Sequence, residues 1–355
     1  MLSPYPWHYT LRWPIYFNWP SVRNHTHMDL VPDQYNFYPN KVQTVRLLFC
    51  GDIMVQNKDK TPQLHPELCH LIQSADLFIG NCESPVDTHL PNDQAKYQFT
   101  FNMPRAYLEN IISQTSLAPE QWLLSMANNH TGDQGYEICL RTEEILKDIG
   151  VIPLGRYLSN QPPLHIIRYK NLNLGFIAWT EWMNREIFPS KDPGAFRNEH
   201  VLAHSWKTIK STYHLDYLIG IPHWEYEFQH FPHQQTRLLA KHLINELGID
   251  CLVGIHTHTL QPMEWFEGGV CAYNLGNFCG LARAWPVKLI PLLEVNLCLT
   301  PGSLHKLVSY KMHYFFQQHT SKSVNIIPLN EAPALEQKRL IKRINQIFIT
   351  TQNKN

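Results

Sequence analysis

The chain has 355 residues, of which 44% are hydrophobic and 17% are charged, and its 30 Lys and Arg residues balance its 30 Asp and Glu residues. This is the composition of a globular protein of one or two domains, and it excludes a disordered or coiled-coil chain. Because there is no net basic charge, we expect no general electrostatic attraction to nucleic acid or to acidic membranes.

Residues 1–44 form an N-terminal segment that is rich in proline and aromatic residues and is expected to be irregular. Two roles are open for it. It could be an exposed aromatic arm that binds a partner protein, or an extended segment that lies over the domain with its aromatic rings buried. We favour the second role.

From residue 45 onward, short apolar runs typical of strands alternate with helical periods. We expect strands at 45–50, 76–80, 121–127, 174–179, 216–221, 250–253 and 269–273. We expect helices at 66–72, 105–113, 136–149 and 234–247. This alternation predicts an α/β domain, and the continuous apolar runs indicate strands that are buried on both faces.

Polar side chains stand where five of these strands end. They are Asp52, Asn81 with Glu83, Asn129 with His130, His223, and His256 with His258. Because ligand chemistry gathers at the carboxyl ends of parallel strands, these ends are expected to meet at one edge. Each position alone has an ordinary explanation, such as a turn or a helix cap. It is the combination that indicates a site.

His256 and His258 stand two residues apart, directly after the strand expected at 250–253. On an extended strand, side chains two apart point to the same side, so both rings could offer a nitrogen to one metal centre. A chain with 20 histidines also produces such pairs by accident. We therefore interpret the pair only together with the other strand ends.

Two carboxylates, a carboxamide and three imidazoles suit a pair of divalent ions such as Mn, Fe or Zn. Two ions ~3.5–4 Å apart lower the pKa of a shared water from ~15.7 towards ~7 and hold the oxygens of a phosphate ester. The chemistry predicted is hydrolysis by a metal-bridged hydroxide, with no Ser or Cys nucleophile. A glycoside hydrolase using Asp52 and Glu83 is disfavoured because it would leave the histidines without a role.

Six motifs occur in order between residues 45 and 295. They are Gly51-Asp52-Ile53-Met54, Asn81-Cys82-Glu83, Ala127-Asn128-Asn129-His130 with Asp133 and Gly135, His223-Trp224, Gly254-Ile255-His256-Thr257-His258, and Tyr273-Asn274-Leu275-Gly276-Asn277-Phe278. Together they resemble the CapA family of poly-gamma-glutamate capsule synthesis proteins, in the calcineurin-like metallophosphoesterase superfamily. The resemblance implies a metallophosphoesterase-like four-layer α/β/β/α sandwich with a two-metal centre at the sheet edge.

The resemblance also implies a role for each position. Asp52 and His258 would bind the first metal. His223 and His256 would bind the second. Glu83 would bridge the two, with Asn81 as a competitor, while Asn129 would be a further ligand and His130 the general acid on the leaving group. The polar residues expected around these ligands are Asn81, Asn128, Asp133, Glu225 and Asn277.

The chain departs from the family pattern at several positions. Met54 stands where many phosphoesterases have a histidine ligand, which weakens the first metal site or lets it exchange ligands with water, as is usual for the CapA branch. Glu225 follows His223-Trp224 where a glycine is typical. It either adds a carboxylate to the pocket or faces solvent, and we favour solvent. Ile255 and Thr257 replace the commoner His and Pro.

Residues 301–355 form a C-terminal extension after the domain expected at 45–300. A helix is expected at 335–348. One face carries Leu340, Ile341, Ile344, Ile347 and Phe348, and the other carries Lys338, Arg339, Lys342 and Arg343. It could lie on an acidic membrane or dock on the body of the protein. We favour docking.

No secretory signal is evident, because the first twenty residues contain prolines at 4, 6, 14 and 20 and no charged start followed by an apolar core. No later stretch approaches the ~18 apolar residues of a membrane span. The eight cysteines form no Cys-X-X-Cys pair, and we expect buried reduced thiols and not a disulfide framework. These features predict a cytoplasmic protein without a transmembrane segment.

We therefore predict a metal-dependent hydrolase that acts on a phosphate ester or a related polyanionic substrate, with two divalent ions and without a nucleic-acid partner. A hypothesis from another class is a non-catalytic accessory or polymer-binding protein of poly-gamma-glutamate or capsule synthesis, which keeps the fold and binds a metal without turnover.

Overall fold

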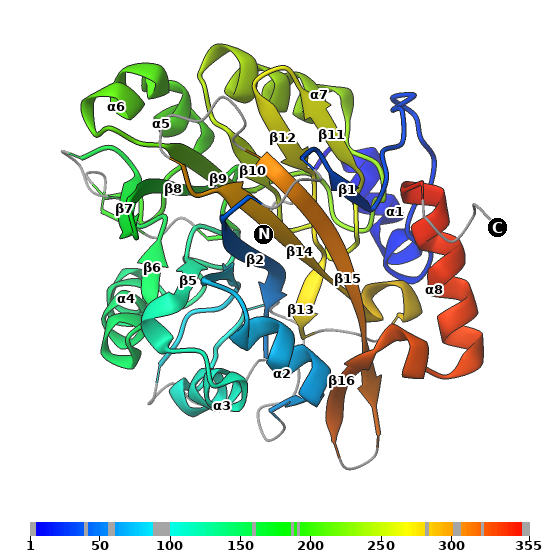
Figure 1. Ribbon diagram of the computed structural model, residues 1–355. Helices are drawn as coiled ribbons and strands as arrows, with labels where there is room; N and C mark the ends of the chain where they lie inside the picture. Colours follow the sequence, from blue (N-terminus) through cyan, green and yellow to red (C-terminus); the bar gives the residue numbers. More distant parts are fainter. Residues whose placement is uncertain are drawn as a thin grey trace.

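The computed structural model describes residues 5–38, 42–55, 61–87, 100–157, 161–185, 188–189, 192–280, 284–300, 307–320 and 323–349. Two β-sheets lie face to face, and helices cover the outer face of each (Figure 1). Separate apolar cores lie between the sheets and under each layer of helices. The predicted α/β/β/α sandwich is therefore confirmed.

The first sheet has ten strands among the described residues, in the order β3-β16-β15-β14-β2-β4-β5-β6, with β1 paired to β15 and β13 to β2. The strands are β1 (Gln34–Asn36), β2 (Thr44–Ile53), β3 (Gln63–Leu64), β4 (Leu77–Cys82), β5 (Trp122–Ser125), β6 (Ile152–Leu154), β13 (Asn277–Cys279), β14 (Leu289–Cys298), β15 (Leu307–His319) and β16 (Val324–Pro328). Because β2, β4, β5 and β6 run parallel, their carboxyl ends lie at the same edge.

The second sheet has six strands among the described residues, in the order β11-β12-β10-β9-β8-β7. The strands are β7 (Leu164–Tyr169), β8 (Leu172–Thr180), β9 (Tyr217–His223), β10 (Cys251–Val253), β11 (Met263–Phe266) and β12 (Gly269–Ala272). Its four central strands are parallel, and both edge strands are antiparallel to their neighbours.

Helices cover the outer faces and the ends of the sandwich. They are α1 (Trp7–Asn18), α2 (Pro66–Gln73), α3 (Arg105–Thr115), α4 (Tyr136–Ile149), α5 (Asn198–Leu202), α6 (Trp206–Thr212), α7 (Gln234–Lys241) and α8 (Ala334–Ile347). A π-helical turn at His242–Glu246 continues α7, so the helix predicted at 234–247 is present but changes its winding. The helix predicted at 136–149 has the same bounds in α4, where Gly150 ends it with a positive φ of 95°.

Burial on both faces explains why the strands are continuous apolar runs. On β2, Leu47 and Phe49 pack between the sheets, whereas Leu48 and Cys50 pack against the helix layer. This is the two-residue alternation of a strand with an apolar core on each side. The prediction that these strands are buried on both faces is confirmed.

The N-terminal segment differs from the irregular segment expected from the sequence, because it contains the helix α1. Tyr9, Trp13 and Phe17 follow one another at intervals of four residues and face the body of the protein. Trp7 lies on the outer side and is 76% exposed. Apolar residues on both sides of the helix hide the helical period from a sequence pattern. The segment does lie over the domain, with part of its aromatic rings buried.

The described part of residues 301–355 belongs to the same sandwich as the preceding residues. β15 pairs along almost its whole length with β14, and β16 pairs with β15. Helix α8 buries Leu340, Ile344 and Ile347 in the core between the sheets. The prediction that this helix docks on the body is confirmed.

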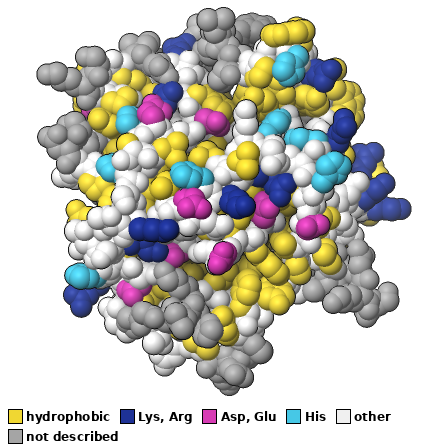
Figure 2. All heavy atoms as spheres, turned by 90° about the horizontal axis from the view of Figure 1, so that it is seen from above, with side chains coloured by type: hydrophobic (Ala, Val, Ile, Leu, Met, Phe, Trp, Pro, Cys, Tyr) yellow, Lys and Arg dark blue, Asp and Glu magenta, His cyan; other side chains and the backbone are white. Residues whose placement is uncertain are grey.

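The remaining global predictions concern thiols, membranes and surface charge. All eight cysteines are free, and seven are buried, as predicted. Among the described residues, no helix combines the length and the apolar character that a membrane span requires. The face drawn in Figure 2 mixes basic, acidic and histidine side chains, in keeping with the balanced charge of the chain.

Candidate metal centre

The candidate centre is built at the carboxyl ends of parallel strands from both sheets. Asp52 lies at the end of β2, and Glu83 directly follows β4. From the second sheet, His223 is the last residue of β9, while His256 and His258 lie in the loop after β10. The first four of these residues are 0% exposed. The sheet edges therefore bring together side chains that lie up to about two hundred residues apart in the chain.

Two groups of side chains among the described residues have the spacing of metal ligands. One comprises Glu83, His223 and His256, and the other comprises Asp52, Glu83 and His258. Within each group, the candidate ligand atoms lie within 4.8 Å of one another. Glu83 belongs to both groups, so its carboxylate lies between two potential ion positions.

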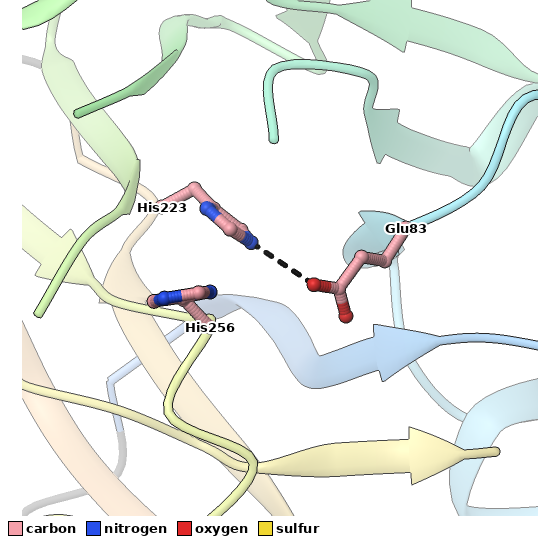
Figure 3. A group of neighbouring side chains, drawn as sticks. All are labelled: Glu83, His223 and His256. Carbon is pink, nitrogen blue, oxygen red and sulfur yellow. Dashed lines mark hydrogen bonds and ion pairs between the residues drawn. The ribbon is translucent and has the colours of Figure 1, made fainter. Parts of the chain in front are cut away.

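The distances around Glu83 show how its two oxygens are shared. Its Oε1 lies 3.3 Å from His223 Nε2, and its Oε2 lies 3.9 Å from His258 Nδ1. His258 Nδ1 also lies 3.4 Å from Asp52 Oδ2. Figure 3 shows the rings of His223 and His256 turned toward the Glu83 carboxylate, and their centroids are 4.3 Å apart.

The backbone conformation of the His-X-His pair differs from the one expected from the sequence. Neither lies on an extended strand, because the φ angles of His256 and His258 are 109° and 57°. The strand alternation expected for this pair is therefore wrong. Their ring centroids are 6.0 Å apart, and each ring joins a different group of ligands. Side chains held in such sparsely populated backbone conformations are common at functional sites.

Asparagine side chains hold Asp52 in place. Asn81 pairs with Asp52 in the β2–β4 register, and its amide donates a hydrogen bond of 2.8 Å to Asp52 Oδ1. Asn128 in turn donates to Asn81 Oδ1 at 3.2 Å and to the carbonyl of Cys82 at 2.8 Å. Both ends of the Asn81 amide are thus used by neighbouring side chains. This favours Glu83 over Asn81 as the residue between the two ion positions.

Burial and neighbouring charges shift the pKa values of the carboxyl and imidazole groups at this centre. Burial and the neighbouring Asp52 carboxylate raise the pKa of Glu83 well above its usual value. Burial opposes the charge of His258, but Glu83 and Asp52 outweigh it and raise the pKa of His258 to about 10. A divalent ion bound here would supply positive charge beside the same carboxylates.

His223 and His256 are held in the neutral form that binds metals. Burial lowers the pKa of His223 to about 3. Burial and the neighbouring imidazoles of His223 and His258 lower the pKa of His256 well below its usual value. A neutral imidazole offers a nitrogen lone pair to a metal, so these two side chains need no deprotonation before they bind one.

Three buried atoms of the centre have no hydrogen-bond partner among the described residues. They are Glu83 Oε2, Asn129 Oδ1 and His256 Nδ1. A buried polar atom without a partner costs roughly 1–3 kcal/mol, and native proteins contain few of them. A divalent ion would supply the missing partner for a carboxylate, a carboxamide and an imidazole, which are suitable donors for Mn, Fe or Zn. The residues present therefore fit a metal.

His130 lies on the turn that follows β5, next to Asn129. Its Nδ1 is 2.6 Å from Asp133 Oδ2, and its ring stacks on Phe101 with centroids 3.8 Å apart. The amide of Phe101 donates to the same Asp133 oxygen. Because Nδ1 of His130 is hydrogen-bonded to Asp133, Nε2 is the ring nitrogen that can exchange a proton with a substrate.

The two remaining residues expected around the ligands have different positions. Asn277 contacts a candidate ligand, since its Oδ1 lies 2.9 Å from His258 Nδ1. Glu225 was expected to face solvent, and this is wrong, because it is only 2% exposed. It accepts hydrogen bonds from the amide and Nδ1 of His233 at 2.6 and 2.7 Å, before α7. This ion pair compensates its burial and turns it away from the ligand groups.

Two residues near the centre were missed in the sequence. Glu227 Oε1 lies 4.0 Å from His258 Nε2, and the hydroxyl of Tyr5 lies 2.8 Å from His256 Nε2. Glu227 could have been noticed as a second acid just after His223. Tyr5 carries no signal, because only the packing of the N-terminal segment brings it to this place.

The match to a known family covers the part of the chain that carries this geometry. Residues 46–280 match the model of the family described as "Bacterial capsule synthesis protein PGA_cap", which is about two thirds of the chain. The chain belongs to this family. The PGA_cap match contains every candidate ligand and His130, whereas Tyr5, α1, β15, β16 and α8 lie outside it.

Two relatives of this PGA_cap chain carry the CapA name. The PGA biosynthesis protein CapA of Bacillus subtilis (strain 168) is 24% identical over 244 residues, which cover 65% of this chain and 62% of the relative. The Capsule biosynthesis protein CapA of Bacillus anthracis is 25% identical over 251 residues, with coverages of 66% and 60%. The chain thus spans about three-fifths of the length of each relative. The predicted resemblance to CapA proteins is confirmed.

Two solved structures show a weak similarity to this PGA_cap chain. A phosphatase from Mycoplasma pneumoniae has a TM-score of 0.47 and 12% identity, and the match covers 86% of this chain and 100% of the other. A 5'-nucleotidase precursor from Thermus thermophilus has a TM-score of 0.45 and 14% identity, with coverages of 85% and 59%. At this level of similarity, the activities of these two proteins say nothing about the activity of this chain.

Proposed function

We propose that this PGA_cap protein is a metal-dependent hydrolase of phosphate esters or related polyanionic substrates. The observation that carries the proposal is the position of Glu83, which two groups of buried ligand atoms share. A buried carboxylate between two sets of imidazole and carboxylate donors is the arrangement expected of a two-ion site. We propose two divalent ions, of Mn, Fe or Zn.

The ligands divide between the two ion positions. Asp52 and His258 would hold one ion, and His223 and His256 would hold the other. Glu83 would bind both. Asn129 would be a further ligand through its Oδ1, which has no other partner among the described residues. Asn81 and Asn277 would hold Asp52 and His258 in place.

Bound divalent ions act as Lewis acids and generate a nucleophile from water at neutral pH. The side chain that would handle the proton of the leaving group is His130. Asp133 fixes its Nδ1 and the stacked Phe101 fixes the plane of its ring, so that Nε2 keeps one orientation. An oriented imidazolium of this kind can donate a proton to a departing alkoxide.

The test is metal analysis combined with a screen of phosphate monoesters and diesters, on the wild type, His256→Ala and His130→Ala. The proposal expects two bound ions and turnover in the wild type, loss of one ion and of turnover in His256→Ala, and loss of turnover alone in His130→Ala. Wild-type protein that binds no Mn, Fe or Zn after purification and reconstitution would contradict the proposal.

One observation favours a second candidate function, that of a non-catalytic accessory or polymer-binding protein. Met54 is fully buried at the place where many phosphoesterases have a second histidine of the first strand. A thioether is a poor ligand for Mn or Zn, so one ion position would lose a donor. Both CapA relatives are named as biosynthesis proteins. Bound metal without any turnover that His130→Ala abolishes would favour this function.

A further inference from the structure

The side chain of Tyr5 reaches the candidate centre from the far end of the chain. Its hydroxyl lies 2.8 Å from Nε2 of His256, 251 residues away. Its ring makes edge contacts with Tyr9, Trp182 and Tyr226, with centroids 5.0, 5.4 and 5.2 Å away. Aromatic contacts on several sides leave the phenol few orientations.

Helix α1 fixes the position of Tyr5 by docking on residues 226–228. The hydroxyl of Tyr9 donates to the carbonyl of Glu227, and the indole N–H of Trp13 donates to the Glu227 carboxylate. Trp13 also packs on Phe228, with centroids 5.4 Å apart. The same Glu227 approaches the candidate ligand His258. The helix is therefore attached to the loop beside the centre and not to a distant surface.

The two nitrogens of His256 have opposite surroundings. Nε2 contacts the Tyr5 hydroxyl, whereas Nδ1 is buried and has no partner among the described residues. An imidazole binds a metal through the nitrogen that carries no proton. If Nδ1 is that nitrogen, the proton is on Nε2, and this N–H donates to the Tyr5 oxygen.

We propose that Tyr5 is a positioning residue of the centre, which accepts a hydrogen bond from His256 Nε2 and thereby directs Nδ1 toward the second ion position. This inference rests on the proposed metal binding. It adds a partner from outside the residues that match the PGA_cap family. Such outer partners fix the tautomer and the ring orientation of metal-binding histidines.

The test compares Tyr5→Phe with Tyr9→Phe in the full chain. Each change removes one hydroxyl from the same segment, but only the hydroxyl of Tyr5 contacts a candidate ligand. Affinity for Mn²⁺ and Co²⁺ is measured by competition with a chromogenic chelator. We expect Tyr5→Phe to weaken one of two bound ions by ~10–100-fold, the usual effect of losing such a partner. We expect Tyr9→Phe to weaken neither ion as much as Tyr5→Phe does, because it loosens the docking of α1 but keeps the hydroxyl that contacts His256.

A double-mutant cycle separates positioning from a general loosening of the segment. In the His256→Ala background, Tyr5→Phe should have no further effect on the affinity of the remaining ion, because the imidazole through which Tyr5 acts is absent. Equal affinities of wild type and Tyr5→Phe overturn the inference. So does equal weakening by Tyr5→Phe and Tyr9→Phe.

The two proposals fail in different ways. Wild-type protein that binds neither Mn²⁺ nor Co²⁺ overturns the proposed function and this inference with it. Wild-type protein that binds both ions, together with an unaffected Tyr5→Phe variant, overturns the role of Tyr5 alone.

Discussion

The carboxylate of Glu83 and the imidazole of His223 belong to different sheets, yet both are fully buried and lie 3.3 Å apart. This contact joins the two sheets at the edge where the candidate ligands gather. Neither sheet alone carries both donors, so the centre depends on the face-to-face packing of the sandwich.

Replacing Glu83 with Gln should remove both metal ions. The amide keeps the shape but loses the negative charge that two groups of ligands share. We expect the metal affinity to fall by more than the ~10–100-fold caused by loss of an outer partner. Elemental analysis of the purified protein checks this. Glu225→Gln is a matched control, because Glu225 is also buried but is bonded to His233, and it should retain the metal. Loss of a single ion in Glu83→Gln would contradict the shared position.

Replacing His130 with Ala should lower kcat and leave the metal content unchanged. A general acid contributes ~10²–10⁴-fold to a rate. The decrease in kcat should be large for an alkyl phosphate and small for p-nitrophenyl phosphate, because p-nitrophenolate can leave without being protonated. Steady-state kinetics with both substrates check this. Equal losses would show that His130 acts in some other way.

Glu294 on β14 should make stability depend on acid pH. Burial alone would raise its pKa, but hydrogen bonds from His313 and Asn296 and the charge of Arg46 lower the pKa to about 2. A carboxyl with a lowered pKa stabilises the fold above its unfolded pKa of ~4.3, and this contribution is lost as the pH falls through ~4 toward 2.

Glu294→Gln should therefore reduce the free energy of unfolding at pH 7 by ~1–2 kcal/mol, allowing for solvent screening at this partly exposed group. The difference from the wild type should shrink as the pH falls below ~4. Urea unfolding at pH 7 and pH 3.5 measures it. A difference of the same size at both pH values would contradict the expected role of the charge.

Leu340→Ala should destabilise the protein by ~2–5 kcal/mol. Leu340 lies on the fully buried side of α8, so its truncation leaves a cavity. Leu335 lies on the same helix and is 57% exposed. Leu335→Ala should change the stability by less than ~0.5 kcal/mol. Chemical denaturation of both variants checks the pair. Similar small effects in both would mean that α8 does not dock as described.

Several features could be predicted because their causes are local. The helix at 136–149 follows from its apolar spacing and from Gly150, which accepts the positive φ that ends a helix. The buried strands follow from their continuous apolar runs, which burial on both faces requires. The candidate ligands were predicted because parallel strands place their carboxyl ends at one edge. Whether these ligands bind metal stays a proposal.

Other features were decided only by tertiary packing. Glu225 was expected in solvent, but His233 lies eight residues away and forms a buried ion pair with it. The hydrogen bond from Asn81 to Asp52 depends on the register of β2 and β4.

The sequence by itself determined the alternation of strands and helices and the polar residues at the strand ends, because these depend on neighbours within a few positions. The resemblance to CapA proteins already implied a shared Glu83 and different ions for His256 and His258. Only the tertiary structure decided that these two histidines reach their groups through positive φ angles, and that Tyr5 meets His256. Contacts across 140 or 251 residues arise from how sheets and helices pack, and no local period of the sequence encodes them.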